Sequence, residues 1–391
     1  MVIKPKIYAN VCINAHPLGC AAQVEDQINY VKSTGSLEGR TRVLIIGASD
    51  GYGMASRIVA AFACGADTIG LSYERAPRPK RTASSGWYKT AAFMKQAATA
   101  GLGAWSIDGD AFSKEIKQET ADAIRAHLGQ IDMLVYSIAA PRRLDPETGE
   151  VYSSVIKPIG APYTGKTLDF QTGVVSEVTV HPATDQEVEH TVKVMGGEDW
   201  RLWIDMLLQE RLLAQDFLTV TYTYVGPEAT RATYRDGTIG KAKEDLEQTA
   251  IDLGQVLSPV DGKACISVQK AIVTRASAVI PAVPLYMSLL YRVMKSKGLH
   301  ENCIQQINRL YREFLFADGD VPTDEQSRIR LDDWEMREDV QADVMDLWHR
   351  VTTENAAELA DIKGFQEDFL LQHGFGVPRV DYVEDVDPML V

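Results

Sequence analysis

The feature that most constrains the fold is the stretch 41–65, in which a buried strand, a glycine-rich turn and a helix follow one another. Four consecutive apolar residues at 43–46 are typical of a parallel strand that is buried on both faces of a sheet. Glycines follow at positions 47, 51 and 53, and apolar residues then recur at helical spacing over 54–62. The sequence therefore predicts a strand-to-helix turn built from glycines.

A turn of this kind is suited to binding a dinucleotide. Glycines let backbone N–H groups approach a diphosphate without a Cβ in the way, and they let the helix pack closely on the strand. The positive end of the helix then faces the diphosphate. The spacing GxxxGxG, from Gly47 to Gly53, resembles that of short-chain dehydrogenases and differs from the GxGxxG of other Rossmann proteins. The alternative is a tight turn that binds no ligand.

Strands and helices alternate after this turn. Apolar runs at 68–74, 104–108 and 131–139 predict strands, and helical patterns at 87–100 and 113–129 lie between them. This alternation indicates an α/β fold with a doubly wound, parallel, Rossmann-type sheet. Ligands of such sheets bind outside the carboxyl ends of the strands, so we expect the functional site there.

The other segments predict additions to the same unit, and we expect one catalytic domain over residues 1–391. Residues 1–40 predict an N-terminal segment packed on the sheet. Residues 141–191 lack regular periodicity and predict an inserted β-hairpin, a flap near the substrate. Residues 301–391 predict a mostly helical C-terminal extension whose charge runs, including the landmark 328–335, are expected to be solvated.

Composition and charge argue against several classes of function. The 391-residue chain has a formal net charge of -14, which argues against nucleic acid as a partner because phosphate contacts require clustered Lys and Arg. The longest uncharged stretch, 276–291, is too short and too interrupted by prolines to predict a membrane span, and residues 1–6 do not resemble a signal peptide. Cys12, His16 and Cys20 lack a fourth ligand at useful spacing, so we expect no metal. The five scattered cysteines predict reduced thiols and a cytoplasmic protein.

Glu74 stands at the carboxyl end of the second predicted strand. An acidic side chain at this position accepts hydrogen bonds from the adenosine ribose and repels a 2'-phosphate, so it favours NADH over NADPH. Four basic residues follow directly and are able to accommodate that phosphate, namely Arg75, Arg78, Lys80 and Arg81. The sequence therefore predicts NADH as the cofactor and leaves residual use of NADPH open.

A second group of candidate residues lies at 224–243, after a strand predicted at 217–225. A tyrosine hydroxyl can donate a hydrogen bond to a carbonyl oxygen that gains negative charge during hydride transfer, and a nearby ammonium stabilises that charge. Tyr234 and Lys243 are the pair that we predict to do this. Lys241 and Lys243 flank the apolar face of the following helix on opposite sides, so at most one of them faces the site.

This segment resembles the signature of the trans-2-enoyl-CoA reductase and FabV-type enoyl-ACP reductase family. Eight residues separate Tyr234 from Lys243, as in that family, in the setting Tyr224 to Glu228 and Gly240 to Lys243. Similar segments occur over nearly the whole chain, at 3–5, 47–53, 108–112, 136–139, 193–200 and 272–277. The stretch 228–239 is nearer to the CoA-reductase branch than to the ACP-reductase branch.

The resemblance implies roles for individual residues. It implies a proton donor at Tyr234, with Lys243 beside it, and a substrate contact at Tyr224. It implies NADH contacts at Gly47, Ala48, Ser49, Asp50, Gly51, Tyr52, Tyr73, Glu74, Asp110, Ala111, Ile138, Ala139, Lys243, Ile272, Val273 and Thr274.

The reaction so implied is the NADH-dependent reduction of the carbon–carbon double bond of trans-2-enoyl thioesters, in fatty acid metabolism. Short-chain enoyl-CoA is the expected substrate, enoyl-ACP is the alternative carrier, and the enzyme is expected to act as a monomer. A short-chain ketone reductase is the rival within the enzyme class, although the chain lacks the YxxxK spacing of ordinary short-chain dehydrogenases. A non-catalytic NADH-binding sensor is the alternative from another class.

Overall fold

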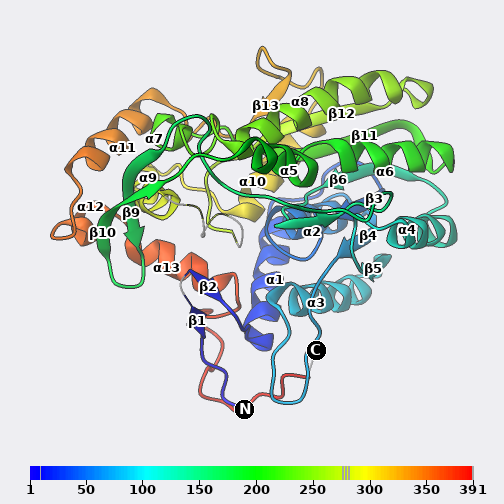
Figure 1. The fold of residues 1–391 in the computed structure, drawn as a ribbon. Coiled ribbons are helices and arrows are strands. Elements are labelled where there is room, and N and C mark those ends of the chain that lie inside the picture. The colour runs from blue at the N-terminus through cyan, green and yellow to red at the C-terminus, as the bar shows by residue number, and fades with distance from the viewer. Residues whose placement is uncertain (9, 275–276, 278–279, 281, 390–391) are drawn as a thin grey trace.

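A seven-stranded parallel sheet forms the centre of the fold (Figure 1). The computed structural model describes residues 1–8, 10–274, 277, 280 and 282–389. The strand order is β13-β12-β11-β6-β3-β4-β5, and all neighbours run parallel. The bounds are β3 Arg42–Ile46, β4 Asp67–Ser72, β5 Ala104–Asp108, β6 Ile131–Tyr136, β11 Leu213–Thr223, β12 Lys263–Val268 and β13 Arg328–Arg330. The predicted α/β, doubly wound sheet is confirmed.

The order of the strands reverses between β3 and β6, which is where sheets of this topology bind their ligands. The apolar run at 43–46 is buried on both faces, as predicted. Val43 and Ile45 pack into the core on one side of the sheet, whereas Leu44 and Ile46 pack into the core on the other. The glycine turn at 47–53 therefore leaves the sheet at its ligand-binding edge.

Helices cover both faces of the sheet (Figure 1). The core of one face contains side chains from α1, α2, α3 and α10, and the core of the other face contains side chains from α4, α6 and α8. The bounds are α1 Pro17–Ser33, α2 Gly51–Phe62, α3 Ser85–Thr99, α4 Lys114–His127, α6 Glu198–Gln209, α8 Thr238–Val256 and α10 Cys303–Arg309, which continues as a π-helix over Leu310–Leu315. Ser113 caps α4 by accepting a hydrogen bond from the Ile116 amide, as the sequence predicted.

A further core lies beside the sheet, around helix α9. Tyr286, Leu290 and Tyr291 of α9 have no exposed surface, and helices α11 and α13 and strand β9 pack around them. The elements of this layer are α9 Val283–Ser296, α11 Glu338–Arg350, α12 Ala356–Leu359, α13 Ile362–Leu371, β9 Tyr163–Asp169 and β10 Val174–Val180. None of the helices in the described part of the chain combines the length and apolar character needed to span a bilayer.

The segment between β6 and α6 contains more structure than the sequence predicted. The expected hairpin is present as β9 and β10, which pair antiparallel from Tyr163–Val180 to Asp169–Val174. A second hairpin precedes it, formed by β7 Arg142–Leu144 and β8 Val151–Ser153. Helix α5, Asp185–Met195, was missed, although Thr184 and Glu187 form a capping box at its start. The capping box was the sequence signal that could have revealed it.

The C-terminal region adds a strand as well as helices. Strand β13 pairs with β12 at the edge of the sheet, so the helical description of 301–391 was incomplete. The prediction that the charges of 328–335 are solvated was wrong for three of them. Arg328 is 6% exposed, and Asp332 and Glu335 have no exposed surface. Charged residues buried to this degree require partners inside the protein.

The N-terminal segment forms a short hairpin followed by α1. Its strands are β1 Ile7–Tyr8 and β2 Val11–Cys12. His16 caps α1 with its side chain, and Cys20 has no exposed surface. Among the residues that the structure describes, no three His, Cys, Asp or Glu side chains are grouped so that they could hold a metal ion.

We expect Lys166→Met to loosen the hairpin β9–β10. The Lys166 ammonium donates to the carbonyl oxygens of Trp348, His349 and Val351 at the end of α11, at 2.8, 3.2 and 3.0 Å. A cation at a helix C-terminus contributes roughly 0.3–1 kcal/mol. Hydrogen exchange of the hairpin amides should become faster in this variant. The exposed Lys363→Met is the control, and equal exchange in both variants would contradict the anchoring role.

Candidate active site

The glycine turn after β3 has no room for larger side chains. Gly47 has a φ of +87°, and a Cβ there would overlap the carbonyl oxygen of Ser137, which follows β6. A Cβ on Gly53 would overlap the carbonyl oxygen of Gly47. The turn, the start of α2 and the end of β6 therefore meet backbone to backbone at the switch point of the sheet.

Asp50 fixes the N-terminus of α2. Its carboxylate accepts a hydrogen bond from the Gly51 amide at 2.9 Å, from Ser85 at 3.1 Å, and from the ammonium of Lys89 at 2.5 Å. The Lys89 side chain is only 3% exposed, so this ion pair is shielded from water. These contacts orient the first turn of α2, whose amides face the predicted diphosphate position.

Glu74 lies next to the turn, as the sequence predicted for an adenosine-ribose contact. The Ser49 hydroxyl donates to Glu74 Oε1 at 2.8 Å, and the Glu74 amide donates to Asp108 at 2.7 Å. A Cβ on Gly86 would overlap the Glu74 carboxylate, so α3 approaches it closely. Tyr73 differs from these residues because its side chain is 79% exposed. The structure brings Glu74 to the glycine turn and leaves the Tyr73 side chain in solvent.

The segment with the predicted cofactor residues Asp110 and Ala111 is held by a buried ion pair. Lys117 donates to the carbonyl oxygen of Ala111 at 2.8 Å and to Asp199 at 2.7 Å, and Tyr136 donates to Asp199 at 3.0 Å. Burial lowers the pKa of Lys117 and raises the pKa of Asp199, and their attraction opposes both shifts. The adjacent Asp110 accepts from the Phe112 amide at 3.0 Å. Nothing in the sequence indicated that Lys117 and Asp199 form an ion pair that holds this segment, because the two residues are far apart in the chain.

Ile138 and Ala139 follow β6 directly. The Ile138 side chain packs against the core that lies under α4, α6 and α8, and the neighbouring Ser137 amide donates to Ile46 at 2.8 Å. These two predicted cofactor residues therefore lie beside the glycine turn that follows β3.

The last predicted cofactor segment, 272–274, follows β12. The Val273 amide donates to the Tyr291 hydroxyl at 3.2 Å, and the Val273 carbonyl accepts from Gln372 at 3.1 Å. A Cβ on Gly51 would lie 3.9 Å from the methyl group of Thr274, so this segment faces the glycine turn. Two separate strand ends thus converge at the predicted cofactor site.

Tyr52 connects the end of β12 with the glycine turn that follows β3. The Tyr52 hydroxyl donates to the Lys270 carbonyl oxygen at 3.0 Å and lies 3.3 Å from Gln306. Tyr52 is therefore tied to the end of β12 by its side chain. Its backbone remains in the first turn of α2, where the sequence predicted a cofactor contact.

The predicted catalytic residues lie after β11. Tyr224 directly follows the strand, and its ring packs edge-to-face on the ring of Tyr234, with a centroid distance of 5.0 Å and an interplanar angle of 75°. Burial raises the pKa of Tyr234, so its phenol remains protonated at neutral pH. The structure thus brings Tyr224 and Tyr234 together, as the sequence predicted.

Lys243 is the buried lysine of the two candidates. It is 7% exposed and its ammonium is 3.5 Å from the Tyr222 carbonyl oxygen, whereas Lys241 is exposed and pairs with Glu244. Burial lowers the pKa of Lys243 to about 8, and the charge of Glu247 opposes that fall. The helical argument that only one lysine faces inward is confirmed.

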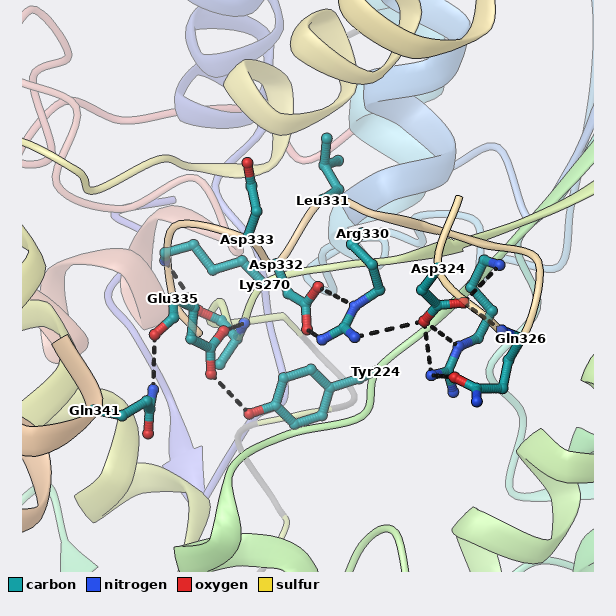
Figure 2. Close-up of polar contacts among 12 residues, drawn as sticks. Tyr224, Lys270, Asp324, Gln326, Arg330, Leu331, Asp332, Asp333, Glu335 and Gln341 are labelled. Atoms are coloured by element: carbon teal, nitrogen blue, oxygen red, sulfur yellow. Dashed lines mark hydrogen bonds and ion pairs between the residues drawn. The ribbon is translucent and has the colours of Figure 1, made fainter. Parts of the chain in front are cut away.

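Sequence analysis missed a buried carboxylate at this site. The Tyr224 hydroxyl donates to Glu335 Oε1 at 3.0 Å (Figure 2). Glu335 comes from the C-terminal region, and its position in the run of charges at 328–335 gave no sign that it is buried. Burial raises the pKa of Glu335, and hydrogen bonds from Tyr286 and the Ala271 amide oppose that rise.

Family models match almost the whole chain. The model described as "Trans-2-enoyl-CoA reductase catalytic region" matches residues 81–316, and "NAD(P)H binding domain of trans-2-enoyl-CoA reductase" matches residues 2–79. A third model, "Enoyl reductase FAD binding domain", matches residues 323–386.

The residues of segment 323–386 do not fit a flavin dinucleotide. Acidic side chains outnumber basic ones there, which disfavours a diphosphate, and the glycine-rich strand-to-helix turn of this chain lies at 47–53. The buried carboxylates of the segment have protein partners, since Asp332 pairs with Arg330 and Glu335 accepts from Tyr224. The segment therefore lacks the features of a flavin site.

Individual relatives match over their full length. The chain is 52% identical to a Flavobacterium johnsoniae "Enoyl-[acyl-carrier-protein] reductase [NADH]", covering 100% of this chain and 98% of the relative, and 54% identical to one from Coxiella burnetii, covering 99% and 96%. The crystal structure of Treponema denticola trans-2-enoyl-CoA reductase in complex with NAD has a TM-score of 0.96 and 49% identity, covering 99% and 98%. That of the Clostridium acetobutulicum enzyme in complex with NADH has a TM-score of 0.97 and 43% identity, with the same coverage. The chain therefore belongs to the family of trans-2-enoyl-CoA reductases and NADH-type enoyl-[acyl-carrier-protein] reductases.

Proposed function

We propose that this chain uses NADH to reduce the carbon–carbon double bond of trans-2-enoyl thioesters, as an oxidoreductase of fatty acid metabolism. The observation that carries the proposal is the cluster after β11, where protonated Tyr234 packs on Tyr224 and the buried ammonium of Lys243 lies in the following helix. This cluster follows a strand end of the same sheet edge that carries the glycine turn. A proton donor, a cation and a dinucleotide turn are the parts that the reaction needs.

The residues present fit NADH. We propose that it is held by the backbone of the turn at 47–52, by Tyr73 and Glu74, by Asp110 and Ala111, by Ile138 and Ala139, by Lys243, and by Ile272, Val273 and Thr274. Glu74 supports NADH over NADPH because its carboxylate lies beside the turn and would repel a 2'-phosphate. When bound, NADH supplies the hydride that adds to Cβ of the enoyl group.

Tyr234 is the proposed acid. Addition at Cβ moves negative charge onto the thioester oxygen, and the Tyr234 hydroxyl donates a hydrogen bond to that oxygen. Tyr234 also supplies the proton that ends on Cα, either directly or through the enol, and this gives the saturated thioester. Lys243 is the proposed cation that holds the nicotinamide ribose and stabilises the developing charge. We propose Tyr224 as the substrate contact beside this donor.

The acyl carrier is the part of the substrate that the relatives' names divide. The two relatives from Flavobacterium and Coxiella are named as reductases of enoyl-[acyl-carrier-protein]. The two solved structures are named as reductases of enoyl-CoA. We propose short-chain enoyl-CoA as a substrate and enoyl-ACP as the alternative. Both carriers present the same enoyl thioester, on which Tyr234 and Lys243 would act.

The experiment that tests the function follows NADH absorbance with crotonyl-CoA, with crotonyl-ACP and with a short-chain ketone. We expect rapid oxidation with one or both thioesters and none with the ketone. Binding of NADH without turnover of either thioester would overturn the proposal and favour a cofactor sensor, and turnover of the ketone alone would favour a ketone reductase.

We expect NADH affinity to fall as the pH rises through about 8. Burial lowers the pKa of Lys243 to about 8, so the ammonium is charged below this pH and neutral above it. If only the charged form holds the ribose, affinity falls up to about tenfold per pH unit above 8. Fluorescence titration of NADH between pH 6 and pH 10 measures this, and Lys243→Met should remove the dependence.

Two variants separate Lys243 from other lysines. Lys241→Met removes an exposed lysine of the same helix and should leave the pH dependence unchanged. Lys270, whose pKa burial also lowers to about 8, is a second buried lysine that titrates in this range. If Lys270→Met removes the dependence and Lys243→Met keeps it, the assignment to Lys243 is wrong.

We propose that residues 1–391 act as one catalytic unit and as a monomer in the cytoplasm. The segment 141–191 packs on α9 through β9, and 301–391 supplies both β13 and Glu335, which supports a single unit. The proposed site is formed by residues of this chain and needs no residue from a second subunit. The cysteines are free thiols, which fits a reducing compartment. Analytical ultracentrifugation at working concentration tests the monomer, and a dimer would overturn it.

A further inference from the structure

Glu335 is a buried carboxylate that connects three separate segments of the chain. It lies shortly after β13 and has no exposed surface. Figure 2 shows its carboxylate facing the Tyr224 hydroxyl, which comes from the end of β11. A buried charge is costly unless the protein supplies hydrogen bonds to it, so its partners define its role.

Both carboxylate oxygens accept hydrogen bonds. Oε1 accepts from the hydroxyls of Tyr224 at 3.0 Å and Tyr286 at 2.6 Å, and Oε2 accepts from the Ala271 amide at 2.6 Å. Tyr286 lies in α9, and Ala271 directly precedes the proposed cofactor segment 272–274. Glu335 thus links the proposed substrate tyrosine to the cofactor loop.

The directions of these hydrogen bonds are determined. Gln341 donates to the Tyr286 oxygen at 3.2 Å and to the Glu335 backbone carbonyl at 2.8 Å (Figure 2 shows the latter bond). The Tyr286 oxygen therefore accepts a hydrogen bond from Gln341, and the Tyr286 hydroxyl donates a hydrogen bond to Glu335. Tyr224 also donates, so Glu335 Oε1 accepts two hydrogen bonds, one from each tyrosine hydroxyl. These bonds hold each ring at its hydroxyl end.

Lys270 balances the buried charge. It is 2% exposed and donates to the carbonyl oxygens of Ala271 at 3.1 Å and Glu301 at 3.4 Å. Its positive charge favours the ionised form of Glu335, and Glu335 in turn favours the charged form of Lys270. The carboxylate form is the one that can accept all three hydrogen bonds.

We propose that Glu335 is a positioning residue for the reaction, which holds the Tyr224 ring against Tyr234 and joins this pair to the cofactor loop at Ala271. The proposal rests on the proposed reductase function. The single O–H group of Tyr224 is used in the hydrogen bond to Glu335. Tyr234 is therefore the tyrosine that donates a hydrogen bond to the thioester oxygen. The Tyr224 ring, anchored at its hydroxyl, forms the wall on which Tyr234 packs at 5.0 Å between centroids. A displacement of the donor by about 1 Å can cost about 100-fold in rate.

The first test compares substitutions at Glu335 with a matched substitution nearby. Glu335→Ala should lower kcat about 100-fold with a small change in the KM of the thioester. Glu335→Gln should restore most of the loss, because the amide oxygen can accept from Ala271 while its NH2 group donates to the tyrosine oxygens. Asp332→Ala is the control, since Asp332 is equally buried and pairs with Arg330 (Figure 2). Its kcat should equal that of the wild type.

The second test is a double-mutant cycle with Tyr224→Phe at saturating NADH. If Glu335 acts through Tyr224, then Glu335→Ala, Tyr224→Phe and the double variant should lose kcat to a similar extent. NADH affinity measured by fluorescence should weaken in Glu335→Ala, which frees the Ala271 amide, and stay unchanged in Tyr224→Phe. A merely structural role would not separate these two readouts.

Three results would overturn the proposal. Equal losses in Asp332→Ala and Glu335→Ala would show a general loosening of the C-terminal segment. Losses that multiply in the double variant would show that Glu335 does not act through Tyr224. A Glu335→Gln variant as slow as Glu335→Ala would show that the charge matters and the placement does not.

Failure of the reductase function is recognised separately. It appears in the wild type, as NADH binding without turnover of crotonyl-CoA or crotonyl-ACP, and the positioning role then falls with it. Where the wild type is active, the two tests together decide on Glu335. Because Glu335→Gln keeps the side-chain volume and the same three hydrogen-bond partners, it provides the comparison if Glu335→Ala does not fold.

Discussion

Replacing Tyr234 by phenylalanine is expected to lower kcat for enoyl thioester reduction by about 10²–10⁴-fold, the range for loss of a general acid. The substitution removes one oxygen and keeps the ring that packs on Tyr224. Burial raises the pKa of Tyr234, so the wild-type phenol keeps its proton for donation over the whole working pH range. In the phenylalanine variant, no hydroxyl at this position donates a hydrogen bond to the thioester oxygen as its negative charge develops.

The measurement is NADH oxidation with crotonyl-CoA and crotonyl-ACP, together with an NADH titration of both proteins. NADH affinity should stay close to that of the wild type, because Tyr234 is not among the proposed cofactor contacts. Tyr382→Phe serves as the control, since this hydroxyl bonds Gly374 and Val377 in the C-terminal region. Full turnover by Tyr234→Phe would refute its role as the acid and leave Lys243 as the remaining candidate.

Gly47→Ala is expected to abolish NADH binding at concentrations that saturate the wild type and to destabilise the fold. Gly47 has a φ of +87°, which costs a residue with a Cβ about 1–2 kcal/mol. The added Cβ would also overlap the Ser137 carbonyl oxygen, and overpacking of this kind costs about 1–3 kcal/mol more. Relief of the overlap would shift the ends of β3 and β6, which carry the proposed cofactor contacts at 47–52 and at Ile138 and Ala139.

Gly65→Ala is the matched control for this substitution. Gly65 follows α2 with a φ of +67°, but no atom lies within 4 Å of the position that its Cβ would take. It should therefore lose only the conformational part, about 1–2 kcal/mol, and bind NADH normally. Thermal unfolding and NADH titration measure both effects. Equal destabilisation of the two variants, with NADH binding intact in both, would show that the close approach of Gly47 to Ser137 does not matter.

The local patterns of the sequence predicted the sheet well. The strand at 43–46, the glycine turn and the Ser113 cap could be predicted because each depends on residues within a few positions of one another. The separation of Lys241 from Lys243 could be predicted for the same reason, since the 3.6-residue period of their helix places the two lysines on opposite sides.

Elements without a strong local period were predicted less well. Helix α5 has few buried positions, namely Thr191 and Val194, so its apolar stripe is weak and only its capping box was a clear signal. Strand β13 has three residues, and its strand conformation depends on pairing with β12. A strand this short carries no usable alternation, because its stability comes from the partner strand.

The α/β class and the dinucleotide turn could be inferred from the sequence alone, and the sequence also predicted the pair Tyr234 and Lys243, because these features depend on spacing along the chain. Only the tertiary structure decided which charges are buried and what they bind. Glu335 lies 111 positions from Tyr224 and 64 positions from Ala271, and the fold brings all three into contact. The physical reason is that a carboxylate has the same sequence pattern whether it faces water or the interior, and its environment is set by segments that local periodicity does not describe.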